Sequence, residues 1–79
     1  MGRNLVTPGD YIHDRRRESG LTQGQLAKML GLPDGEYHAI ERDERQPSDE
    51  TILSIARVLR MKPRWLMQRY GRPYRATGA

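Results

Sequence analysis

The pattern of apolar and polar positions along this chain predicts a series of short helices and no strand. The clearest stripe is formed by Ile52, Ile55, Ala56 and Leu59, at positions i, i+3, i+4 and i+7. This stripe and similar spacing elsewhere predict helices over residues 8–19, 23–30, 34–41, 49–59 and 63–69. We expect their apolar sides to meet in one core, with contributions from Leu26, Leu30, Ile40, Ile52, Ala56, Leu59 and Leu66.

Capping residues mark where these helices begin and end. Thr7 is placed to cap the first helix, with Pro8 at the first helical position. Thr22 and Gln25 have the spacing of a capping box at the start of the second helix, and Gly31 ends it. Only two residues separate Gly31 from the next helical pattern. Two short helices joined through such a turn indicate a helix-turn-helix.

Several short motifs follow one another in one order along most of the chain. They are Gly20-Leu21-Thr22-Gln23, Leu26-Ala27, Leu30-Gly31, Ile40-Glu41-Arg42, Pro47-Ser48, and Ile55-Ala56 with Leu59. This order resembles the lambdoid phage repressor and Cro-type helix-turn-helix family. The resemblance implies an all-α fold of five helices, the lambda repressor-like DNA-binding domain. We expect this domain over residues 7–69, with an N-terminal arm at 1–6 and a basic flexible tail at 70–79.

The resemblance also implies where DNA would be contacted. The helix over residues 34–41 would enter the major groove while the preceding helix crosses the DNA backbone, the docking geometry general to this motif. Gln23 would approach a phosphate, and Arg42 and Arg45 the sugar-phosphate backbone. The positions implied to face the bases are Asp34, Gly35, Glu36 and Ala39.

The same resemblance implies a structural ion pair between Arg16 and Glu41, which would bridge the first helix to the end of the third. Its expected role is to hold these helices together. Removing one partner of such a pair, if it is buried, would leave the other charge uncompensated.

The acidic start of the third helix departs from what a base-reading helix usually offers. Helices that recognise guanine and adenine carry hydrogen-bond donors such as Arg, Lys, Gln or Asn. The carboxylates of Asp34 and Glu36 can only accept hydrogen bonds, for example from cytosine N4. Acidic groups also stabilise a helix in its first turn. Two interpretations stay open: a DNA-binding regulator, or a protein-interaction module on this scaffold with weakened base readout.

The net charge of +4 is unevenly distributed. Residues 1–50 hold seven Lys or Arg against ten Asp or Glu, while residues 51–79 hold seven basic residues and no acid. The basic half favours a polyanion, and nonspecific DNA binding through it is a third interpretation. Arg69, Arg72 and Arg75 are candidates to reach phosphates beside the site. Alternatively the tail packs on a dimer partner through Tyr70 and Tyr74, or is a spectator.

Composition narrows the remaining classes of function. There is no cysteine, and His13 and His38 are isolated, so we expect no metal site, no disulfide, no cofactor and no catalytic residue. No apolar run is long enough for a membrane span. The sequence thus favours a cytoplasmic transcriptional regulator, a homodimer on double-stranded DNA, of a phage or plasmid repressor-like or DNA-binding antitoxin-like kind.

Overall fold

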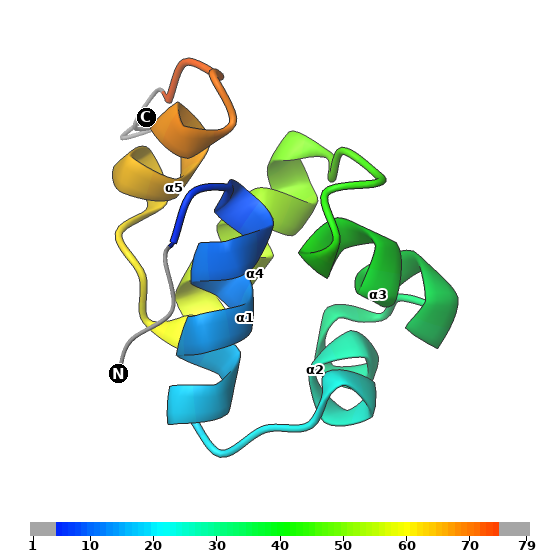
Figure 1. The fold of residues 1–79 in the computed structure, drawn as a ribbon. Helices are drawn as coiled ribbons and strands as arrows, with labels where there is room; N and C mark the ends of the chain where they lie inside the picture. The colour runs from blue at the N-terminus through cyan, green and yellow to red at the C-terminus, as the bar shows by residue number, and fades with distance from the viewer. Residues whose placement is uncertain (1–4, 75–79) are drawn as a thin grey trace.

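Five helices joined by short connections form the described part of the protein, residues 5–74 of a computed structural model (Figure 1). The helices are α1 (Pro8–Glu18), α2 (Gln23–Leu30), α3 (Asp34–Glu41), α4 (Asp49–Leu59) and α5 (Pro63–Arg69). Residues 5–74 contain no strand, so the predicted all-α fold is confirmed for them. The bounds agree with the sequence prediction, except that α1 ends one residue earlier because Ser19 is its C-cap.

The caps explain why the helices begin where they do. The Thr7 hydroxyl accepts from the Asp10 amide and the Asp10 carboxylate accepts from the Thr7 amide, both at 3.2 Å. Thr22 and Gln25 form the same reciprocal pair at 3.0 and 2.8 Å. At the end of α2, Gly31 takes a left-handed conformation (φ 71°), which glycine adopts without steric cost. Local sequence therefore determines these boundaries.

The helices are arranged as two packed pairs with α1 between them. The helices α2 and α3 pack together on one side, α4 and α5 on the other, and α1 contacts both α3 and α4 (Figure 1). Arg15 on α1 adds a polar tie to the second pair, because its guanidinium donates to the carbonyls of Leu59 and Arg60 at the end of α4 (2.9 and 3.3 Å). Within residues 5–74, no other helix covers the outer side of the α2–α3 pair (Figure 1).

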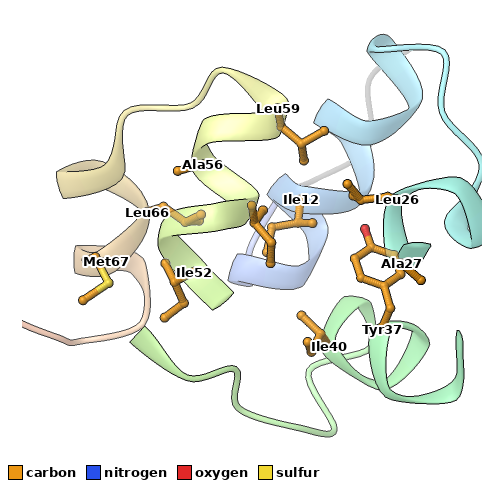
Figure 2. Packing of buried hydrophobic residues seen from close by; sticks show 11 residues of the cluster. Ile12, Leu26, Ala27, Tyr37, Ile40, Ile52, Ala56, Leu59, Leu66 and Met67 are labelled. Atoms are coloured by element: carbon orange, nitrogen blue, oxygen red, sulfur yellow. The ribbon is translucent and has the colours of Figure 1, made fainter. Parts of the chain in front are cut away.

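A single apolar cluster fills the space between the helices (Figure 2). Leu26 and Ile40 belong to it, as the sequence predicts, whereas Leu30 is only partly buried at its edge. The cluster also includes Ile12 of α1 and the ring of Tyr37, both fully buried. Its members are Ile12, Leu26, Ala27, Tyr37, Ile40, Ile52, Ile55, Ala56, Leu59, Leu66 and Met67.

The start of α1 lies directly against the end of α3. The Gly9 amide donates to the Asp43 carboxylate at 3.0 Å, and Asp43 itself holds a left-handed backbone (φ 60°). A Cβ at residue 9 would overlap the backbone carbonyl oxygen of Glu41. Glycine is therefore required here by close approach of two backbones.

Residues 70–74, which we name the C-terminal segment, fold back onto the domain. The sequence predicts a flexible tail here. In the structure Tyr70 and Tyr74 pack against the core cluster, and Arg72 donates to Asp49 at 2.8 Å and to Gln46 at 3.1 Å. The apolar bodies of the two tyrosines explain the difference, since burying them favours an ordered chain. Arg75 lies outside the described residues.

Replacing Gly9 by alanine should destabilise the domain by about 1–3 kcal/mol, because the new methyl group forces two backbones apart. Gly24→Ala is a matched control, since Gly24 occupies the same second position of α2 and its Cβ would meet nothing closer than 4.0 Å. The control should gain up to about 1 kcal/mol from helix propensity. Thermal unfolding of both variants checks this, and equal shifts would contradict the close approach.

Candidate nucleic-acid interface

The helix α3 has one buried and one outward side. Tyr37 and Ile40 are in the core, while Asp34 and Gly35 are exposed at the start of the helix. Glu36 and Ala39, the other two positions implied to face bases, are half-buried. The four residues thus occupy the accessible part of α3, next to the uncovered side of α2.

Two of the residues implied to contact DNA lie near each other. The Arg45 guanidinium is 3.8 Å from the Glu36 carboxylate, a long ion pair on an accessible surface. Its contribution to stability is small, in the range of about 0–1 kcal/mol. The pair nevertheless partly neutralises one of the two acids in the first turn of α3. Arg42, at the C-cap of α3, is exposed.

Beneath this surface, the carboxylate of Glu41 accepts hydrogen bonds from three helices. Arg16 Nε of α1 donates to Oε2 at 2.6 Å, and the Tyr37 hydroxyl of α3 donates to the same oxygen. Gln23 Nε2 of α2 donates to Oε1 at 3.0 Å, and His13 Nδ1 lies 2.9 Å from that oxygen. Arg16 and Glu41 are each only 7% exposed. We call these five side chains the Glu41 cluster.

The ionised carboxylate determines the tautomer of His13. An ionised carboxylate only accepts, so His13 Nδ1 must carry a proton and donate to Glu41. Arg16 Nη2, 3.3 Å from the same nitrogen, is then a close neighbour and not a hydrogen-bond donor to it. Arg16 Nη1 instead donates to the carbonyl of Leu21 at 2.7 Å, which ties the cluster to the α1–α2 connection.

The cluster shifts the acidity of its members. Burial alone would raise the pKa of Glu41, but the hydrogen bonds from Arg16, Tyr37, His13 and Gln23 outweigh it and lower that pKa to about 2. Burial and the neighbouring carboxylate both raise the pKa of the Tyr37 hydroxyl. Glu41 is therefore charged, and Tyr37 neutral, throughout the physiological range.

Gln23 is expected to contact a phosphate, but its side-chain amide already donates one hydrogen bond within the protein. One N–H of the amide goes to Glu41, which leaves the second N–H for another acceptor. A shallow cleft of about 450 Å³ separates Gln23 from Arg42. Its walls are formed by Thr7, Asp10, His13, Gln23, Glu41, Arg42 and Asp43.

Tyr37 and His13 are members of the Glu41 cluster that the sequence did not predict. The available signal was spacing: Tyr37 precedes Glu41 by four residues and His13 precedes Arg16 by three, so each pair shares a helix face. Within residues 5–74 no set of three or more His, Cys, Asp or Glu is grouped to hold a metal ion. No helix of that part of the chain has the length and apolar character to cross a bilayer.

Comparison with known proteins places this arrangement in a family. The model of the family described as Helix-turn-helix matches residues 12–66. Repressor protein C2 of Salmonella phage P22 is 30% identical over 65 residues, which cover 82% of this chain and 30% of that protein. The HTH-type transcriptional regulator DicA of Escherichia coli (strain K12) is 29% identical over 62 residues, 78% of this chain and 46% of that protein. The chain thus spans less than half the length of both relatives.

The gain in stability from Glu41 should depend on pH. Because the folded-state pKa is about 2 against an ordinary 4.5, the stabilisation is complete above pH 4.5 and is lost as the pH falls to about 2. The loss should be about 3 kcal/mol. Denaturant unfolding between pH 5 and pH 2 measures it. Glu41→Gln should flatten this part of the curve, and an unchanged slope would contradict the shift.

A second test separates the members of the cluster. Glu41→Leu leaves Arg16 buried without its partner and should cost about 3–5 kcal/mol. Arg16→Met together with Glu41→Leu should recover part of this loss, and adding Tyr37→Phe should recover more, because it removes a buried hydroxyl that has lost its acceptor. Chemical unfolding of the three variants gives the comparison. A double variant no more stable than Glu41→Leu alone would contradict a coupled cluster.

Solved structures agree with the sequence matches. The crystal structure of the P22 c2 repressor protein in complex with synthetic operator 9T in the presence of Tl⁺ superposes with a TM-score of 0.72 at 29% identity, and covers 78% of this chain and 94% of that one. The solution structure of the P22 c2 repressor DNA-binding domain gives the same TM-score and identity, over 82% and 86%. The fold, the motifs and the matched residues together show that this chain belongs to the helix-turn-helix family.

Proposed function

We propose that this protein is a sequence-specific transcriptional regulator that binds double-stranded DNA with α3 in the major groove. The observation that carries the proposal is the uncovered α2–α3 pair, on the same five-helix scaffold as a repressor solved with an operator. The major groove is wide enough to admit one helix, and its base edges differ between the four base pairs. An outward α3 is what such readout needs.

The residues around α3 would fix the position of the protein on the duplex. Gln23 is the first residue of α2, so its free amide N–H lies beside backbone N–H groups that favour a phosphate. Arg42 and Arg45 follow α3 and would contact the sugar-phosphate backbone. Such contacts set register and orientation without reading sequence.

The acids of α3 are better explained by the helix itself than by base reading. Pro33, the N-cap of α3, gives no side-chain hydrogen bond to the first turn. Asp34 and Glu36 therefore compensate the positive end of an otherwise uncapped helix, by about 0.3–1 kcal/mol each. Cytosine N4 remains the one base donor that either carboxylate would accept from.

We propose that the protein acts as a homodimer. A homodimer on a two-fold operator would place two copies of α3 in successive major grooves. A repressor or regulator is favoured over an antitoxin, because the two curated relatives are named as a repressor and a transcriptional regulator. Those names also favour action in the cytoplasm.

A second candidate function is a protein-interaction module that has kept the scaffold. The observation in its favour is the outward face of α3, which carries two carboxylates and neither Lys nor Arg. A basic partner surface would suit it better than DNA. Absence of any duplex bound in the experiment below would favour this candidate.

Selection from a pool of random-sequence duplexes tests the proposed function. The full chain should enrich one sequence, and anisotropy titration against the enriched duplex should show tighter binding than to an unselected duplex of the same length. Gln23→Ala should weaken binding by about 0.5–1.5 kcal/mol, the usual net worth of a hydrogen bond. Gln68→Ala is a matched control, since Gln68 is exposed on α5. Equal effects of the two changes would contradict the role of Gln23.

The acids of α3 are tested on the same duplex. If Asp34 and Glu36 serve the helix alone, Asp34→Ala and Glu36→Ala should tighten binding by removing repulsion from phosphates, and should leave the base preference unchanged. Selection repeated with each variant measures the preference. A preference relaxed at a single base pair would instead assign that carboxylate to cytosine.

A further inference from the structure

We propose that Arg72 is a positioning residue for DNA binding: it holds the loop between α3 and α4 in place and touches no phosphate itself. This loop, residues 42–48, carries Arg42 and Arg45. The inference rests on the proposed function, because those two arginines are its expected backbone contacts.

Arg72 clamps the far end of this loop through both terminal nitrogens. Nη1 donates to the Asp49 carboxylate at 2.8 Å and Nη2 donates to the Gln46 amide oxygen at 3.1 Å. The planar guanidinium presents these donors in a fixed fork, so the two contacts fix the spacing between Gln46 and the start of α4. The guanidinium also lies 5.9 Å from the centre of the Tyr70 ring.

The middle of the loop borders an open pocket, whereas Pro47 near its far end is buried, so the clamp acts where packing is weakest. A cavity of about 230 Å³ lies under the loop, between the start of α1 and the end of α5. The near end of the loop is held by the hydrogen bond from Gly9 to Asp43, and the far end of the loop is held by Arg72. Arg45 lies between these two attachments and lines the same cavity.

The base of the Arg72 side chain is itself held in place. Its backbone amide donates to the Met67 carbonyl at 3.0 Å, after a left-handed Gly71 (φ 70°) that turns the chain back from α5. Tyr70 and Tyr74 pack against the core on either side. A guanidinium on an ordered backbone loses less conformational freedom when it binds, so even an accessible ion pair can restrain the loop.

The contacts of Arg72 argue against a direct phosphate contact. Each terminal nitrogen already gives one N–H to an acceptor, and a phosphate drawn to the remaining N–H groups would lie beside the Asp49 carboxylate, whose charge repels it. The two roles predict opposite effects of Asp49. If Arg72 positions the loop, removing Asp49 weakens DNA binding; if Arg72 is a phosphate contact that Asp49 masks, removing Asp49 strengthens it.

The experiment is a double-mutant cycle on the full chain, titrated against the duplex that the wild-type protein enriches. Arg72→Gln and Asp49→Asn should each weaken binding about threefold, the scale of an accessible ion pair, and the double variant should be no weaker than either alone. Two controls carry the same charge changes without the clamp: Arg64→Gln on α5, and Glu50→Gln in the first turn of α4, both exposed. Glu50→Gln should bind as tightly as wild type or tighter.

Amide hydrogen exchange gives a readout that does not depend on DNA. The Asp43 and Glu44 amides donate to the carbonyls of Ile40 and Ala39, at 3.1 and 2.9 Å. Their exchange should quicken about threefold in Arg72→Gln, the same accessible-ion-pair scale, and stay unchanged in Arg64→Gln. Quickened exchange with unaltered DNA binding would overturn the positioning role while leaving the proposed function intact.

Two further outcomes would also overturn the inference. Tighter binding by Asp49→Asn beside weaker binding by Arg72→Gln would make Arg72 a phosphate contact. No enrichment of any duplex by wild type would remove the proposed function and the inference with it. Because wild-type binding is measured first, the failure of the inference is distinguished from the failure of the function.

Discussion

A buried carboxylate that must stay paired is the constraint on which the rest of this molecule depends. Glu41 ends α3 inside the protein, where an isolated charge would cost several kcal/mol. Donors from α1, α2 and α3 itself meet that need. Because the donors come from different helices, satisfying one charge also fixes how α1, α2 and α3 sit relative to one another.

This explains how so short a helix can present a defined surface. The helix α3 has eight residues and no side-chain cap, and a free helix of that length would be marginal in water. Its buried side is held by Tyr37 and Ile40 in the core and by Glu41 beneath. The inward residues thus hold the frame that presents the outward ones.

Sequence was sufficient for the helices and insufficient for the contacts between distant segments. The boundaries are local: Thr7 and Thr22 cap within three residues, and Gly31 ends α2 by its own backbone preference. The family resemblance located Arg16 and Glu41, but not the amide of Gln23 on the same carboxylate. Contacts between residues far apart in the chain, such as Arg72 with Asp49, produce no periodic pattern in the sequence. The sequence therefore predicts a flexible basic tail, although Tyr70 and Tyr74 pack against the core in the structure.

The three consecutive arginines of α1 produce little net positive potential at the protein surface. Arg15 donates to the last carbonyls of α4 and also pairs with Glu18 at 3.4 Å on the surface. Arg16 faces inward to Glu41, and the exposed Arg17 has no counter-charge within 4 Å among residues 5–74. The helix also carries three acids, Asp10, Asp14 and Glu18, which equal the three arginines in number, so long-range attraction of a polyanion to this face is weak.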